Sequence, residues 1–443
     1  MTRSVWLSVC LMIALLTGCS AGIEYDPVQT PIPGMAAAAR EEVGPSGDDI
    51  RHPTGKVSVW SYYAGAEWIV PVIQAEYPDL KVEVITVPWD NYEENYLTAI
   101  DHGNAPDVLL VDNNMLGKLV SLNIFEDLSA APYNGEPLAR RFTASTISPF
   151  RSLTDNRLFA LPLDVGPGVA YYRRDLFLKA GLPADPEELG RFMEDPNNWL
   201  RAALKLKQQG SWIASSDWDP IWMTEYASGF FDRSLDYARD TSSFAAAIDL
   251  ARNIRKNGLA SGLDPYSEAG RAALNDGKTA MFFNGWWYGN NLKTVAPDTS
   301  GLWRMMRLPL GLYGWAGSSG TAISASSRNK PGAWAVVNTL AKHIADVAGN
   351  SALKGTTTAP GDPYYGGQQT QTLYADLVRH MPPFTPTPLD DKAKKIWAQF
   401  VGSALDSDRD PNETLDYIRQ LTMDSLQSDL DLLKAEQISP PSS

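Results

Sequence analysis

Several tryptophans stand beside aspartate, asparagine or serine in segments whose pattern predicts loops. The chain has 14 tryptophans in total. An indole stacks on the apolar face of a pyranose ring, while carboxylate and amide oxygens accept hydrogen bonds from the ring's hydroxyl groups. The residues offering this chemistry are Trp60, Ser61, Trp89, Asp112, Asn113, Asp164, Trp218, Asp219, Trp222, Trp286 and Trp287. Their types and grouping predict a site that binds a carbohydrate.

Simpler roles compete with ligand binding for the tryptophans. Four others lie on predicted helix faces and are expected to pack there: Trp68, Trp199, Trp334 and Trp397. The neighbours Trp286 and Trp287 point in different directions, so one is expected to line the site and the other to join the core. Trp286 is the favoured stacking residue.

The acidic residues also have alternatives. Asp112 and Asn113 are expected either to accept hydroxyl groups or to cap the following helix. Asp164 either binds hydroxyl groups or holds a turn between two lobes. The pair Asp217 and Asp219 follows two serines and is typical of a solvated turn, which argues against catalysis there.

Composition and motifs exclude several classes of function. A net charge of −14 and a pI near 4.8 argue against binding to nucleic acid or to anionic lipid. The four histidines lie far apart without metal-ligand spacing, and no phosphate-binding loop or nucleophile elbow occurs. The prediction is a non-enzyme with no cofactor, no metal and no nucleic-acid partner.

The N-terminus predicts export. One cation, Arg3, precedes an apolar run of about 12 residues, which is too short for a stable membrane span. The run closes on Leu16-Thr17-Gly18-Cys19, which resembles a bacterial lipobox. The resemblance implies that residues 1–19 are a lipoprotein signal peptide and that Cys19 receives a diacylglyceryl group. The protein is then lipid-anchored outside the cytoplasm.

The segment after this signal, residues 20–54, is rich in proline, glycine and alanine and predicts a disordered tether. The only cysteines, Cys10 and Cys19, belong to the export signal, so the mature chain forms no internal disulfide.

Alternating strands and helices are predicted to position the candidate ligands. Residues 57–60, 81–87 and 108–111 read as strands separated by helices, a pattern typical of a parallel sheet covered on both faces. Ligands bind beyond the carboxyl ends of such strands, where Trp60-Ser61-Tyr62, Trp89 and Asp112-Asn113 fall.

The rest of the chain continues this pattern. Strands are expected at residues 158–162, 280–283 and 321–324, and the glycine-rich segment 314–320 brings Ser318 to the predicted site. Residues 175–280 are mostly helical, as are 333–345, 390–405 and 412–434.

Five groups of segments, read in order, resemble family 1 extracellular solute-binding proteins of ABC importers, the class that includes maltose-binding proteins. They are residues 55–60, 104–108, 161–162 with 171–177 and 180–183, 277–281 with 284–286, and 317–323. Together they cover nearly all of residues 55–430.

The resemblance implies an α/β, two-lobed type II fold, each lobe a parallel-rich sheet flanked by helices, with a hinged cleft between the lobes. Residues 55–162 plus 310–350 would form the N-terminal lobe, and residues 163–309 plus 351–443 the C-terminal lobe. The chain would cross near 162–165, 308–311 and 345–360. A monomer that captures a carbohydrate and delivers it to an ABC transporter permease is the function implied.

Two other functions stay open. The same fold also binds polyamines, whose recognition needs acidic and aromatic groups that this chain has. A secreted glycoside hydrolase would need two carboxylates about 5–10 Å apart across the sugar, and no spacing in the sequence supports that pair.

Overall fold

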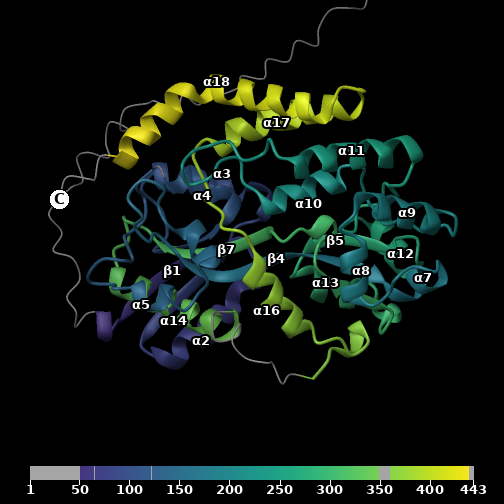
Figure 1. Cartoon of the computed structure of the whole chain (residues 1–443). Coiled ribbons are helices and arrows are strands. Elements are labelled where there is room, and N and C mark those ends of the chain that lie inside the picture. Colours follow the sequence, from purple (N-terminus) through teal and green to yellow (C-terminus); the bar gives the residue numbers. More distant parts are fainter. Residues whose placement is uncertain (1–49, 64, 121, 349–359, 439–443) are drawn as a thin grey trace, which may run out of the picture. The chain divides into compact units, whose positions relative to one another are not determined.

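The computed structural model describes residues 50–438, except Ala64, Ser121 and residues 349–359 (Figure 1). The predicted signal peptide with Cys19 and residues 20–49 of the tether lie outside this part of the chain. Most of the third predicted crossing, at 345–360, also lies outside it.

A mixed sheet of seven strands runs through the described residues. Its strands are β1 (Gly55–Ser61), β2 (Leu80–Thr86), β3 (Val108–Asp112), β4 (Leu161–Arg173), β5 (Met281–Gly285), β6 (Trp303–Met306) and β7 (Trp315–Ile323). They lie in the order β2-β1-β3-β7-β4-β5, and β6 pairs with β4. β1 is parallel to β2 and β3, whereas β7, β5 and β6 all pair antiparallel.

This pairing corrects the prediction of a parallel-rich sheet for the strands that pair with β4. Among the seven named strands, parallel pairing is found in β2-β1-β3, and β5, β6 and β7 pair antiparallel with β4. The prediction relied on continuous apolar strands, which indicate burial on both faces. Helices can cover both faces of an antiparallel sheet as well, so burial alone does not determine strand direction.

β4 and β7 are the strands shared by two groups of core side chains. The first half of β4 pairs with β7, and its second half pairs with β5 and β6. One core cluster draws on residues 57–163 and 322–341, and the remaining clusters draw mainly on residues 165–430. In β4 the change falls between Leu163 and Val165, where the register of its pairing with β7 also shifts.

Residues 162–165, the first predicted crossing, lie within β4, and residues 308–311, the second, lie before β7. Leu310 packs against a cluster of the second group, and its amide donates a hydrogen bond to the carbonyl of Met193. β7 then makes the connection, with Trp315 in one cluster and Ile323 in the other. Proline restricts the backbone near residue 309 but does not determine where the chain crosses.

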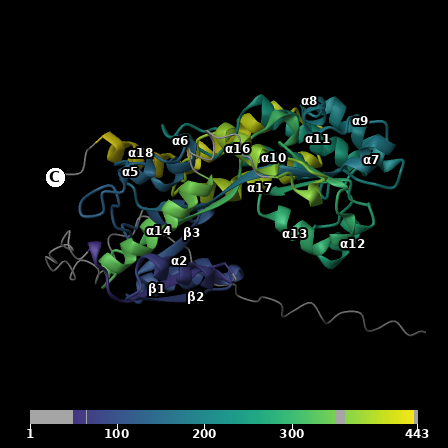
Figure 2. The same ribbon diagram turned by 90° about the horizontal axis from the view of Figure 1, so that it is seen from below.

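Helices surround the sheet (Figures 1 and 2). They are α2 (Ile69–Glu76), α3 (Tyr92–Asp101), α4 (Asn113–Val120), α5 (Glu136–Ala139), α6 (Ala144–Ile147), α7 (Arg174–Lys179), α8 (Pro186–Phe192), α9 (Pro196–Lys207), α10 (Asp219–Ala227), α11 (Ser242–Asn257), α12 (Glu268–Asn275), α13 (Tyr288–Val295), α14 (Lys330–Ala348), α16 (Thr370–His380), α17 (Asp390–Leu405) and α18 (Pro411–Ile438). Short 3-10 helices are η2 (Ala66–Trp68), η3 (Trp89–Asn91), η4 (Ser148–Phe150), η5 (Pro297–Thr299), η6 (Pro309–Gly311) and η7 (Pro363–Tyr365). In this part of the chain, no helix combines the length and apolarity that a membrane span requires.

Local sequence explains where several helices begin and end. Asp185 and Asp195 cap α8 and α9 by accepting hydrogen bonds from backbone amides of the first turn, and proline follows each cap. α11 ends at Gly258, whose left-handed φ of 58° suits glycine. The facing sides of α11, α17 and α18 contribute to one apolar cluster, which holds these helices together (Figure 1).

Candidate ligand-binding site

Asp164 lies at the irregularity where β4 shifts register against β7, and it is partly exposed. Its Oδ1 accepts a hydrogen bond from the Ser319 amide at 2.6 Å, and its Oδ2 accepts one from the Tyr63 hydroxyl at 2.5 Å. Burial raises the pKa of the Asp164 carboxyl, and the hydrogen bonds from Tyr63 and Ser319 oppose that rise. Asp164 thus joins β4, β7 and the segment after β1.

Two tyrosines that follow β1 complete this junction. The hydroxyl groups of Tyr62 and Tyr63 both contact the Ser319 hydroxyl. Burial and nearby carboxylates, Asp164 among them, raise the pKa values of both tyrosines well above the usual value. Both therefore stay protonated at neutral pH and can donate hydrogen bonds.

Asn113 connects the start of α4 to this junction of β4, β7 and the segment after β1. Its Oδ1 accepts a hydrogen bond from the Ser318 amide at 3.0 Å, and the Ser318 hydroxyl donates to the Asp164 carbonyl at 3.2 Å. Asp112, the last residue of β3, is 6% exposed and lies near enough to Tyr62 to raise its pKa. Of the predicted ligands, Asp112, Asn113, Asp164 and Ser318 thus lie together.

Trp287 covers three glycines beside this polar group. A Cβ atom placed on Gly285 would lie 2.1 Å from the indole, one on Gly166 2.6 Å from it, and one on Gly317 3.0 Å from it. Only residues without a side chain allow the ring to lie this close to β4, β5 and β7. The indole remains 41% exposed, so its outer face is available for stacking.

Other aromatic and polar groups continue the surface from Trp287. Its Nε1 donates to the Tyr266 hydroxyl at 3.4 Å, and that hydroxyl donates to Asn284 Oδ1 at 3.1 Å. Tyr266 is 50% exposed. Burial, and after it the charge of Tyr266, raises the pKa of Tyr226.

Trp286, the favoured stacking residue, has a different environment. Its ring packs against Tyr374 at 4.8 Å, and it is partly buried against two core clusters. Exposure therefore favours Trp287 over Trp286 as the stacking residue, the reverse of the expectation from sequence. Neighbours on a chain face opposite ways, and the sequence alone does not tell which one faces out.

Trp60 and Ser61, the last residues of β1, pack and form hydrogen bonds next to the junction. The Trp60 ring packs against Tyr96, and its carbonyl accepts the Tyr96 hydroxyl at 3.0 Å. Ser61 is fully buried, and its Oγ accepts a hydrogen bond from the Tyr63 amide at 2.9 Å. Ser61 thus shapes the turn that presents Tyr63.

Trp89 joins the site through Tyr62. Its indole is 56% exposed and meets the Tyr62 ring edge-on at 5.3 Å. Tyr62 in turn contacts Ser319, so Trp89 packs against the edge of the Asp164 junction.

Trp218, Asp219 and Trp222 lie at the start of α10. The rings of Trp218 and Trp222 stack at 6.2 Å, and Trp218 packs against the cluster that holds α11, α17 and α18. Asp219 is 2% exposed and accepts hydrogen bonds from the amides of Ser215 and Ser216. It holds the turn before α10, in which Ser215, Ser216 and Asp217 are partly exposed and Asp219 is buried.

The buried Asp219 predicts a pH dependence of stability. Burial raises its pKa from 3.8 to about 7 despite the two amide donors, and Asp217 adds to the rise. The folded state then binds more protons than the unfolded state between about pH 4 and 7, so stability falls as the pH rises through that window. The difference across it is up to about 4 kcal/mol. Urea denaturation of wild type and Asp219→Asn from pH 4 to 8 checks this, because the variant should lose that part of the slope. Equal slopes would contradict the assignment.

Several residues of the junction were absent from the predicted ligands, namely Tyr62, Tyr63, Ser319 and Tyr266. The strand-end rule that selected Ser61 also placed Tyr62 beyond β1, and Tyr63 is the next residue along the chain. Tyr266 lies in a loop before α12, and no local pattern marks it. Within the described residues, no His, Asp and Glu side chains are grouped so as to hold a metal ion.

The family assignment follows from comparison with known proteins. Residues 53–346 match the model of the bacterial extracellular solute-binding proteins. The chain belongs to this family, as its sequence segments predicted.

Relatives and solved structures agree with this assignment. An arabinooligosaccharide-binding protein of Halalkalibacterium halodurans is 24% identical over 306 residues, covering 63% of this chain and 65% of the relative. The sugar-binding protein MalE of Xanthomonas citri superposes with a TM-score of 0.67 at 17% identity, covering 86% of this chain and 99% of that one. The galacto-N-biose-/lacto-N-biose I-binding protein of Bifidobacterium longum, in complex with lacto-N-biose, gives 0.66 at 17%, covering 85% and 97%. The predicted two-lobed α/β fold class is thereby confirmed.

Proposed function

We propose that this protein binds a carbohydrate at the junction of β4, β7 and α4. The observation that carries the proposal is the half-exposed Trp287 indole, which packs closely against three glycines near Asp164 and Asn113. An apolar platform next to hydrogen-bond acceptors matches a pyranose, which has an apolar face and a rim of hydroxyl groups. The sugar-binding relatives support the same class of ligand.

Ligand binding is proposed to close two lobes around this junction. The two groups of core clusters meet at β4 and β7. Asp164 lies in β4 at this meeting point and accepts hydrogen bonds from Tyr63 after β1 and from Ser319 in the shared strand β7. A ligand that contacts groups on both sides favours the closed state by its differential affinity.

A thermal-shift screen tests the proposed ligand class. Purified mature protein is heated with arabinose, galactose and glucose, with their oligosaccharides, and with spermidine. A ligand at 100 times its dissociation constant stabilises the folded state by about 2.7 kcal/mol. Stabilisation by a sugar and not by spermidine supports the proposal. Stabilisation by spermidine alone favours the polyamine alternative, and release of shorter sugars would indicate a hydrolase.

We propose further that the protein is a monomer, lipid-anchored through Cys19, that delivers its ligand to an ABC transporter permease. The lipobox-like Leu16-Thr17-Gly18-Cys19 supports the anchoring. Cys19→Ala should move the protein out of the detergent phase of a detergent partition or leave its signal peptide uncleaved. Partitioning of the processed variant like wild type would contradict lipidation at Cys19.

A further inference from the structure

The Tyr266 hydroxyl lies at the edge of the Trp287 indole. Trp287 Nε1 donates a hydrogen bond to it at 3.4 Å, and the tyrosine and the tryptophan are 50% and 41% exposed. A pyranose stacked on an indole keeps about 3.5–4.0 Å between the two rings and projects its hydroxyl groups past the indole edge. A group bonded to Nε1 lies just beyond that edge, so the Tyr266 oxygen is within reach of one of those hydroxyl groups.

The hydrogen bonds of Tyr266 determine which way its proton points. Its hydroxyl donates to Asn284 Oδ1 at 3.1 Å, and the amide of Gly285 donates to the same oxygen at 2.8 Å. Because a backbone N–H requires an acceptor, the Asn284 side chain turns its oxygen, and not its NH2 group, toward this point. The single proton of Tyr266 is therefore committed to Asn284.

The Tyr266 oxygen keeps only acceptor capacity toward a ligand. The Trp287 Nε1 is a donor without a lone pair, so it cannot receive the Tyr266 proton. Its hydrogen bond of 3.4 Å is longer than the usual range of about 2.7–3.2 Å, which leaves the half-exposed oxygen open to a second donor. A hydroxyl group of the ligand can be that donor, whereas an ether oxygen, a hydrogen atom or a fluorine atom in its place cannot.

Tyr266 is held in this position before a ligand arrives. Its amide donates to Asp264 Oδ1 at 3.0 Å, and its carbonyl accepts a hydrogen bond from Arg271 Nη1 at 2.6 Å. Its ring meets Tyr288 edge-on at 5.1 Å, and the Tyr288 hydroxyl donates to the carbonyl of Pro265. Since the side chain is already ordered, little freedom is lost when it binds a hydroxyl group.

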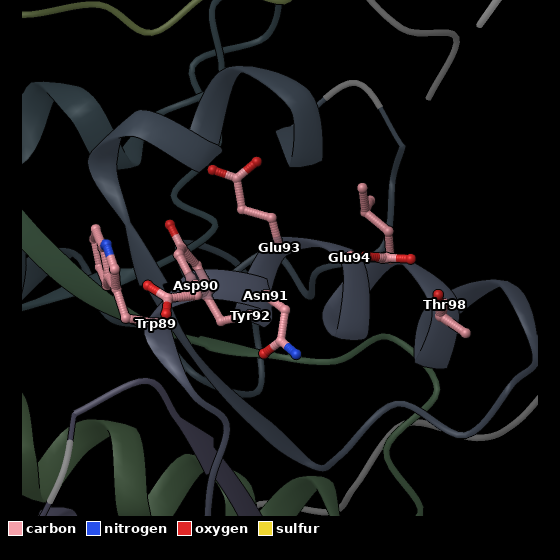
Figure 3. A pocket seen from close by; sticks show the side chains of 8 residues that line it. Trp89, Asp90, Asn91, Tyr92, Glu93, Glu94 and Thr98 are labelled. Atoms are coloured by element: carbon pink, nitrogen blue, oxygen red, sulfur yellow. The ribbon is translucent and has the colours of Figure 1, made fainter. Parts of the chain in front are cut away.

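The pocket along η3 and α3 differs from Tyr266 in this respect (Figure 3). It has a volume of about 690 Å³, and its lining side chains include Asn91 and Thr98. An asparagine amide offers both donors and an acceptor, and a threonine hydroxyl also does both. A polar group placed in this pocket can therefore donate or accept, whereas at Tyr266 it must donate.

We propose that Tyr266 determines specificity by accepting a hydrogen bond from one free hydroxyl group of the sugar stacked on Trp287. The site then discriminates against sugars in which that hydroxyl group is absent, replaced or capped. Asn284 is the positioning residue, because it takes up the Tyr266 proton. This inference rests on the proposed carbohydrate function and adds a requirement on the substitution of the ligand.

Binding of modified sugars tests the role of Tyr266. Wild type and Tyr266→Phe are titrated by calorimetry with arabinose, galactose, glucose and their trisaccharides, and the sugar bound most tightly is then used as its set of monodeoxy and monodeoxyfluoro derivatives. For one hydroxyl position, wild type should bind both derivatives about 3- to 10-fold more weakly than the parent sugar, which is the size of one lost hydrogen bond. Tyr266→Phe should bind the parent sugar and both derivatives of that position within about twofold of one another.

Tyr417→Phe is the matched control, since it removes the same group from a 43% exposed tyrosine of α18, and it should bind every sugar as wild type does. A fluorine that preserves wild-type affinity at that position would show that Tyr266 donates, and this would overturn the proposal. So would the absence of any loss in wild type, or losses that all persist in Tyr266→Phe, the result expected if the tyrosine only holds the indole in place. Failure of wild type to bind any of these sugars would instead overturn the carbohydrate function beneath the proposal.

Discussion

Trp287→Ala is expected to weaken sugar binding about 10- to 100-fold while the protein stays folded. The loss corresponds to about 1.4–2.8 kcal/mol, the size expected when a large aromatic contact with the ligand disappears. Stability should fall by only about 1 kcal/mol, because the indole is 41% exposed without ligand. Calorimetric titration and urea denaturation of the same variant give both values.

Substitutions of the glycines that contact Trp287 test whether the position of the indole matters for binding, while the indole itself is kept. Gly285→Ala places a Cβ 2.1 Å from the end of the Trp287 ring, so the ring must move, and binding should weaken about as much as in Trp287→Ala. Gly402→Ala is the matched control, since its nearest neighbour would be 3.5 Å away, at Trp218 in another part of the fold. Normal affinity of Gly285→Ala would contradict stacking on Trp287.

Asp164→Ala is expected to reduce both stability and affinity. The buried amide of Ser319 loses its acceptor, and the Tyr63 hydroxyl loses one of its two partners. An unsatisfied buried donor costs about 1–3 kcal/mol. Affinity should fall as well, because the carboxylate at the centre of the junction is lost.

Asp164→Asn is the control that separates these two effects. Its amide oxygen still accepts the Ser319 amide, and the Tyr63 hydroxyl can donate to Ser319 instead. Most of the stability should therefore return. Urea denaturation and sugar titration of both variants check this, and a fully stable Asp164→Ala would contradict the structural role of the junction.

The sequence predicted the fold class, and it offered candidates for the site, for a definite reason. Strand ends can be found from alternation and apolar runs, and Asp112 and Asn113 were proposed from them, whereas Ser318 was proposed from the glycine-rich segment 314–320. Strand direction after β4 was not predictable, because burial on both faces does not encode it.

Within the site, prediction from sequence was limited because the direction of a side chain cannot be read from its neighbours in the chain. Trp286 and Trp287 are adjacent, and only the packing of Tyr374 and of three glycines separates their roles. Trp218 and Trp222 carry the same residue type and loop-like context as Trp89, yet they belong to α10 and its own cluster. Residue type and local pattern thus identify candidates, and long-range packing selects among them.

A crystal structure of the mature protein with the sugar identified by the thermal-shift screen tests the central claim most directly. We predict a pyranose ring stacked on the outer face of the Trp287 indole, with a ring hydroxyl within hydrogen-bonding distance of Asp164 or Asn113. A sugar bound elsewhere, for example on the stacked pair Trp218 and Trp222, would contradict the proposed site.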